Sequence, residues 1–199
     1  MRDVRSYGTP PFQVVVVHGG PGAGGEMAPV ARELASNRGV LEPIQTATSL
    51  EGQVEELRSV LETQGDPPLT LVGFSWGAWL SFIVAARYPS LVEKLILVGS
   101  GPFEEKYVAQ LGETRRRRLS EAERAEFAQI LAALRDPECD DKDAQLARLG
   151  ALASKTDQYD PIPDGVEDSD RVEARGELFQ SVWLDAAELR RSGELLEMG

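Results

Sequence analysis

The segment from residue 69 to residue 80, which reads LTLVGFSWGAWL, constrains the fold of this chain more than any other. Three of its first four residues are apolar, which is typical of a short buried strand, and the residues after the serine suit a helix. Ser75 stands between two glycines, Gly73 and Gly77, in Gly-x-Ser-x-Gly spacing. A β-carbon at either glycine would collide with a sharp turn, so the pattern predicts a strand–turn–helix unit that raises the serine hydroxyl above the sheet.

A second glycine-rich motif follows another apolar run, the four valines at 14–17. It reads His-Gly-Gly-Pro-Gly and comprises His18, Gly19, Gly20, Pro21 and Gly22. A loop of this kind lies beside a nucleophile elbow, where one of its backbone N–H groups serves as an oxyanion donor. The two motifs together therefore predict one site that contains Ser75 and the 18–22 loop.

The motifs HGGPG at 18–22 and GFSWG at 73–77 resemble those of the α/β-hydrolase superfamily, in particular its proline iminopeptidase-like branch. The resemblance implies that Ser75 is the nucleophile, that the backbone N–H groups of Trp76 and Gly20 form the oxyanion hole, and that the rest of the 18–22 loop supports it. It also implies hydrolysis of an ester, amide or peptide bond, of an aminopeptidase-like kind. The substrate would be a small molecule or a short peptide, and no cofactor is implied.

Strand-like and helix-like segments alternate through the first half of the chain, which predicts an α/β fold with a mostly parallel sheet and helices on both faces. About four strands are expected, at 13–17, 40–46, 69–73 and 94–98. Residues 1–12 are polar and are interpreted as an N-terminal arm. Helices are expected at 27–36, from Thr48 onward and at 76–88; Thr48 and Glu51 have the spacing of a capping box.

The alternation stops near Gly101, which divides the chain into an α/β-hydrolase-like core at 1–101 and a helical cap- or lid-like region at 102–199. Helices in the second region are expected at 103–111, 121–134, 141–154, 171–183 and 186–197. Ser120 and Glu123 again have capping-box spacing.

The composition excludes several classes of protein. The net charge of −12 argues against a nucleic-acid partner and against an anionic membrane surface. Cys139 is the only cysteine, so no intrachain disulfide can form, and no cluster of cysteine and histidine suggests a metal site. No apolar run has the length of a membrane span and the N-terminus lacks a signal core, so a cytoplasmic location is expected.

One component of the expected chemistry is missing from the sequence. A serine nucleophile needs a base, and in this fold the order along the chain is serine, acid, histidine. The only histidine is His18, which precedes Ser75. We interpret His18 as a residue that shapes the oxyanion loop rather than as the base. Either the chain is part of a longer hydrolase, or it is a short protein that lost the lobe with the catalytic Asp and His.

Two functions of different class remain open at this level. The first is a serine hydrolase with Ser75 as its nucleophile. The second is a non-catalytic binding or assembly module that keeps the serine turn as structure. The apolar strand at 94–98 would lie at one edge of the sheet, and the strand at 40–46 would also lack a neighbour. Because proteins usually cover such edges, we expect the chain either to form homo-oligomers through the strand at 94–98 or to fold its helical segment 102–199 over it.

Overall fold

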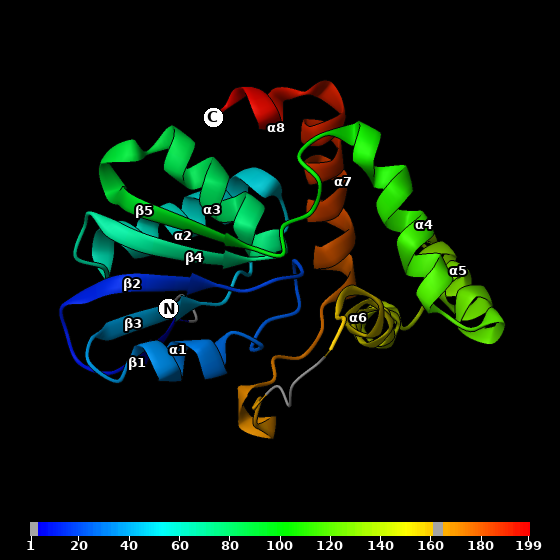
Figure 1. Cartoon of the computed structure of the whole chain (residues 1–199), viewed down its shortest axis with the longest axis horizontal. Coiled ribbons are helices and arrows are strands. Elements are labelled where there is room, and N and C mark those ends of the chain that lie inside the picture. Colours follow the sequence, from blue (N-terminus) through cyan, green and yellow to red (C-terminus); the bar gives the residue numbers. More distant parts are fainter. Residues whose placement is uncertain (1–3, 161–164) are drawn as a thin grey trace.

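The computed structural model describes residues 4–160 and 165–199, and its centre is a five-stranded sheet (Figure 1). The strands run in the order β1-β3-β2-β4-β5, with β1 antiparallel to β3 and every other pair parallel. Their bounds are Val4–Tyr7 (β1), Phe12–Val17 (β2), Gly39–Pro43 (β3), Leu69–Phe74 (β4) and Val92–Val98 (β5). The expected α/β class with a mostly parallel sheet is therefore confirmed, and β4 lies between β2 and β5.

Strand β1 corrects the expectation of four strands and a polar N-terminal arm, of which residues 1–3 lie outside the described part. Tyr7 pairs with Val40 of β3, and its hydroxyl donates a hydrogen bond to Glu42 Oε2 at 2.7 Å. Arg5 donates to the backbone carbonyl of Asp170 at 2.8 Å. These polar contacts are long-range, so they leave no hydrophobic pattern within four residues of sequence. Strand β1 also covers the edge of β3, which was expected to lack a neighbour.

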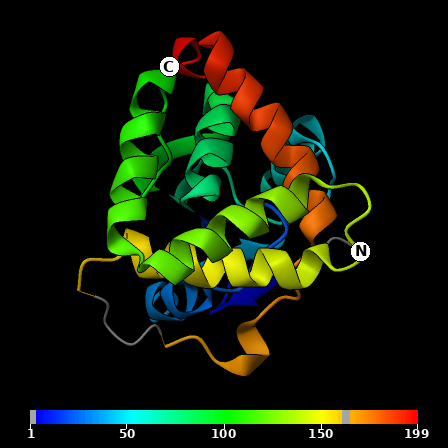
Figure 2. The same ribbon diagram turned by 90° about the vertical axis from the view of Figure 1, so that its right-hand side faces the viewer.

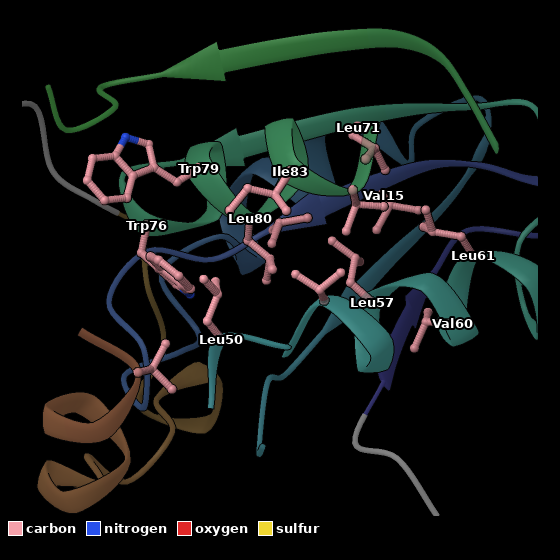
Figure 3. Close-up of a cluster of buried hydrophobic side chains, with 14 of the residues drawn as sticks. Val15, Leu50, Leu57, Val60, Leu61, Leu71, Trp76, Trp79, Leu80 and Ile83 are labelled. Carbon is pink, nitrogen blue, oxygen red and sulfur yellow. The ribbon is translucent and has the colours of Figure 1, made fainter. Parts of the chain in front are cut away.

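The alternation of side chains along the strands builds a core on each face of the sheet. Val14 and Val16 face helix α1 (Ala28–Leu34), where they pack with Met27 and Ala31. On the opposite face, Val15 and Val17 join a larger cluster with helices α2 (Leu50–Thr63) and α3 (Trp76–Arg87), part of which Figure 3 shows. The expected helices on both faces are thus present.

The start of α2 differs from the expectation by one residue. Ser49, not Thr48, is the N-cap, and its side chain accepts a hydrogen bond from the Gly52 N–H at 3.1 Å. The second expected capping box is confirmed, because Ser120 and Glu123 bond each other's backbone N–H at the start of α5.

Most of the helices after residue 101 lie beyond the carboxyl ends of the parallel strands, and the last one turns back toward α3 (Figures 1 and 2). They are α4 (Val108–Arg118), α5 (Glu121–Arg135), α6 (Lys142–Asp157), α7 (Gly176–Ser192) and α8 (Glu194–Glu197), with short 3-10 turns at Pro89–Leu91, Glu105–Tyr107 and Asp168–Asp170. The helix expected at 103–111 begins only at Val108. The two helices expected at 171–183 and 186–197 are instead one long helix and one short turn, separated at Gly193, whose φ is +88°.

Two hydrophobic clusters hold this helical region. Leu119, Ile130, Leu134, Leu146, Leu149 and Leu152 form a separate cluster among α4, α5 and α6. Leu178, Val182 and Ala186 of α7 and Leu195 of α8 belong instead to the main core, with α2 and α3. The main core therefore crosses the division near residue 101. In the described ranges, 4–160 and 165–199, no helix is both long and apolar enough to cross a bilayer.

Candidate active site

Ser75 stands in a strained turn between β4 and α3. Its φ is +52° and its ψ is −113°, and no other non-glycine residue in the described chain has a positive φ. A conformation of this kind costs on the order of 1–3 kcal/mol and persists where the surroundings enforce it. A β-carbon on Gly73 would overlap the backbone of Gly77, and one on Gly77 would overlap the carbonyl oxygens of Val17 and His18. The predicted steric role of both glycines follows from these contacts.

The N-terminus of α3 begins directly after the serine. Trp76 is the first residue of the helix, so its backbone N–H belongs to the first turn, which has no partner within the helix. Its indole is buried and points away from the turn into the core, where Nε1 donates to Gln53 Oε1 at 2.9 Å (Figure 3). The side chain therefore anchors α3, and the backbone of Trp76 is the part next to Ser75.

The 18–22 loop lies against the serine turn, as the motifs predict. The point that a β-carbon on Gly19 would occupy is 3.1 Å from Ser75 Cβ and 3.0 Å from Phe74 Cδ1. Gly20, the next residue, has a φ of +54° and accepts a hydrogen bond from the Ala23 N–H at 3.0 Å, which turns the loop. Pro21 and Gly22 are buried, and the Gly22 carbonyl accepts from the Arg175 N–H at 2.8 Å.

His18 is fully buried, and both of its ring nitrogens contact the backbone. Nε2 accepts a hydrogen bond from the Gln45 N–H at 3.2 Å, so in the neutral ring Nδ1 carries the proton and donates it to the Gly19 carbonyl at 2.8 Å. Burial lowers the pKa of the imidazole to about 4. The ring is therefore neutral at pH 7, and its nitrogens bond to the loop and to the segment after β3 rather than to Ser75.

Glu26 is a further residue of the site, and no sequence motif indicates it. It ends the glycine-rich loop just before α1, is half-buried, and accepts a hydrogen bond through Oε1 from the Gly19 N–H. Burial raises the pKa of this carboxyl to about 7. Its Oε1 lies 3.1 Å from the position that a β-carbon on Gly19 would occupy. Ser75 Cβ lies 3.1 Å from the same position. The sequence signal was a single acidic residue that ends a run of small residues, a pattern without a specific meaning by itself.

Aromatic side chains join the helical region to α3 near the serine turn. Trp79 of α3 and Trp183 of α7 are parallel, with ring centroids 6.0 Å apart. Phe179 is parallel to Trp183 on the same helix, again at 6.0 Å. Arg190 lies over the Trp79 ring, 5.6 Å from its centroid, and donates to Glu105 Oε2 at 2.7 Å. Trp79 is buried in the main core, whereas Trp183 is partly exposed.

A cavity of about 320 Å³ lies between the glycine-rich loop, the segment after β3 and the segment before α7. Its wall includes His18, residues 22–24 of the loop, Gln45 and the segment 172–175 before α7. Because this cavity lies between the loop and the helical region, both parts of the chain shape the space around the loop.

Comparisons with known proteins agree with this architecture. A family model described as the alpha/beta hydrolase fold matches residues 13–171. The chain is similar to the solved structure of VinJ, with 20% identity and a TM-score of 0.57, over 76% of this chain and 56% of that one. It therefore spans little more than half of the VinJ structure. No curated protein matches the chain.

Two further solved structures resemble the chain in fold. One is E-2-(acetamidomethylene)succinate hydrolase, at 18% identity and a TM-score of 0.53, over 92% of this chain and 68% of that one. The other is an epoxide hydrolase of Bacillus megaterium in complex with an inhibitor, at 17% identity and a TM-score of 0.54, over 98% of this chain and 67% of that one. Since the family model covers most of the sequence and the sheet carries a strained serine turn after β4, the chain belongs to the α/β-hydrolase fold family.

Proposed function

We propose that the chain is a serine hydrolase in which Ser75 attacks the carbonyl carbon of an ester, amide or peptide bond. The observation that carries this proposal is the positive φ of Ser75, a strained conformation enforced by the close packing around Gly73 and Gly77. A strained serine directly before a helix N-terminus is what a nucleophile elbow requires.

The oxyanion hole would consist of the backbone N–H groups of Trp76 and Gly20. The N–H of Trp76 lies at the positive end of α3, where a developing negative charge is favoured. Gly20 follows Gly19, which lies against Ser75. Each such donor contributes roughly 3 kcal/mol to the stabilisation of the transition state. His18, Gly19, Pro21 and Gly22 would hold the loop, His18 through its two backbone hydrogen bonds.

The substrate in this proposal is a small molecule or a short peptide. The division into a core at 1–101 and a cap at 102–199 would place specificity in the helices beyond the carboxyl ends of the strands, with Trp183 and Phe179 of α7 as apolar contacts. An aminopeptidase-like preference rests only on the resemblance of HGGPG and GFSWG to the proline iminopeptidase-like branch.

The second candidate is a non-catalytic assembly module. The chain has one histidine, and that residue is buried with both nitrogens bonded. Strand β5 also lies at the edge of the sheet with apolar side chains partly exposed to solvent: Ile96, Leu97 and Val98 are 41%, 39% and 45% exposed. An apolar strand at a sheet edge favours pairing with another chain, so this candidate includes a homo-oligomer formed through β5.

Release of p-nitrophenol from p-nitrophenyl acetate distinguishes the two candidates. We expect slow release, because the chain has no histidine free to take the proton of Ser75. The release should disappear in Ser75→Ala and persist in Ser36→Ala, which removes an exposed serine just after α1. Equal release by the wild-type protein and Ser75→Ala would favour the assembly module.

A further inference from the structure

The proposed function leaves the proton of Ser75 without an acceptor. Attack by the serine requires that its Oγ–H proton move to a base. The only imidazole in the chain belongs to His18, and its Nε2 lone pair already accepts the Gln45 N–H. A different ionisable group beside Ser75 must therefore take the proton if the chain itself performs the attack.

The carboxyl of Glu26 lies on the same side of the glycine-rich loop as Ser75. Its Oε1 and the Cβ of Ser75 are each 3.1 Å from the position that a β-carbon on Gly19 would occupy, so both groups border the same small region. The Gly19 N–H donates to Oε1 and holds the carboxyl there. A carboxylate has about four acceptor sites, so this bond leaves it able to accept a proton as well.

The segment 170–172 packs against the backbone just before Glu26 and holds it in place. Gly25 has a φ of +101°, and a β-carbon on it would overlap the carbonyl group of Asp170. The Val172 N–H donates to the Gly24 carbonyl at 3.3 Å. The loop end is thus packed between the sheet and the segment that leads to α7, which limits how far the carboxyl can move from the serine turn.

The charged groups around Glu26 favour a proton affinity in the neutral range. Glu42 of β3 raises the pKa of Glu26 through its charge, although burial is the larger cause. From β1, Tyr7 donates to Glu42 and Arg5 lies 3.6 Å from it. From α1, Arg32 is paired with Asp170 at 2.8 Å. Both arginines are therefore engaged by other carboxylates.

We propose that Glu26 is the proton acceptor for Ser75 in this chain, either directly or through one bridging water molecule. This inference rests on the proposed function. In the step, the Oγ–H bond of Ser75 breaks, its proton passes to the ionised carboxyl, and Oγ bonds to the carbonyl carbon. The C–O bond to the leaving group then breaks, and Glu26 returns the proton to the departing oxygen. A water molecule releases the acyl group by the same exchange.

This assignment agrees with the chemistry of general bases. A base works best when its pKa is close to the working pH, since it must be both ionised and able to hold the proton. A glutamate in water is far too weak a base at pH 7, whereas Glu26, with its pKa raised by burial to about 7, meets both conditions. Catalytic hydrogen bonds often tighten only when substrate is bound, so the serine need not contact the carboxyl beforehand.

The test is the rate at which a fluorophosphonate probe labels Ser75, followed by intact mass from about pH 5 to about pH 9. We expect the wild-type rate to rise with pH and level off above about 7, the pKa of Glu26. Glu26→Gln keeps an oxygen that can accept the Gly19 N–H but cannot take a proton, so the rate should fall by about 10²-fold and lose this inflection. Glu33→Gln, on an exposed acid of α1, is the matched control and should keep the wild-type profile.

The outcomes separate this inference from the proposed function. If Glu26→Gln labels Ser75 at the wild-type rate with the same pH profile, the inference is wrong and the serine hydrolase remains. A wild-type profile without an inflection near pH 7 also overturns the inference, whether or not Glu26→Gln folds. A wild-type protein whose Ser75 resists labelling at every pH overturns both. Glu26→Asp should retain the inflection at a reduced rate, because the carboxyl is present but further away.

Discussion

The backbone N–H of Ser75 donates a hydrogen bond to the carbonyl oxygen of Val98, with the two atoms 2.9 Å apart. The strained serine turn is therefore fastened to the last residue of β5, the strand whose outer side is exposed. This bond connects the candidate site to the edge of the sheet, so a change in the backbone of β5 should alter the conformation of the Ser75 turn.

Gly77→Ala should destabilise the protein strongly. Its new β-carbon would overlap the carbonyl oxygens of Val17 and His18, and backbone atoms cannot move aside cheaply. We expect a loss of at least about 2 kcal/mol in the free energy of unfolding, measured with urea. The matched control is Gly112→Ala in α4, where a β-carbon meets nothing within 4 Å and a gain of about 1 kcal/mol is expected for a helix. Equal stability of the two variants would contradict the packing described here.

Ser75→Gly should be more stable than Ser75→Ala. Alanine keeps the β-carbon that makes a φ of +52° unfavourable, whereas glycine adopts this region freely. After the greater flexibility of glycine in the unfolded chain is included, we expect a difference of about 1 kcal/mol. Thermal or urea unfolding of the two variants measures it. A more stable alanine variant would show that the turn relaxes once the hydroxyl is removed.

His18→Asn should change how stability depends on pH. The pKa of His18 in the folded protein, about 4, lies below its ordinary value of 6.5, so below pH 6.5 the unfolded chain binds a proton that the folded chain rejects. Folded stability should therefore decrease as the pH falls from about 6.5 to about 4, by an amount on the order of 3 kcal/mol. Glu26 has the opposite sign, because its raised pKa favours the folded state at low pH. The difference between the wild-type protein and His18→Asn isolates the histidine.

The control for that comparison is the stability at pH 7 and above. There His18→Asn should still lose about 1–3 kcal/mol, since two buried backbone groups lose a partner. If the difference between the two proteins does not change between pH 7 and pH 4, His18 does not titrate as its burial requires.

The proposed homo-oligomer through β5 can be tested by sedimentation at micromolar concentration. We expect the wild-type chain to associate, and Ile96→Lys to weaken the association, because a lysine on an edge strand opposes pairing. Leu184→Lys, on an exposed residue of α7, is the control and should leave the association intact. A wild-type protein that sediments as a monomer, with the amides of 94–98 protected from exchange, contradicts this assembly.

The parts of the fold that sequence predicted are those with local, repeating signals. The valines at 14–17, the glycines around Ser75 and the capping pair at Ser120 each report on their own neighbours, and the structure agrees with them. Strand β1 was missed because its four residues are held by distant partners such as Glu42 and Asp170. The sequence pattern predicts two helices, at 171–183 and 186–197, where the structure has the continuous helix α7. This helix runs from Gly176 to Ser192 and ends where Gly193 adopts a positive φ.

The candidate site shows the same contrast. Ser75 and Gly19 could be placed together because each belongs to a motif with a known spatial relation. Glu26 could not, because its relevance depends on its burial and on the Gly19 N–H, and neither is encoded in a short pattern.

The most direct test of the central claim is the site at which a fluorophosphonate probe attaches to the wild-type chain. If Ser75 is the nucleophile, intact mass should show one probe per chain, and peptide mapping should place it on Ser75. Ser75→Ala should remain unlabelled under the same conditions, and Ser36→Ala should label as the wild type does. A chain that stays unlabelled, or one whose probe maps to another residue, would contradict the claim that Ser75 is the nucleophile of this protein.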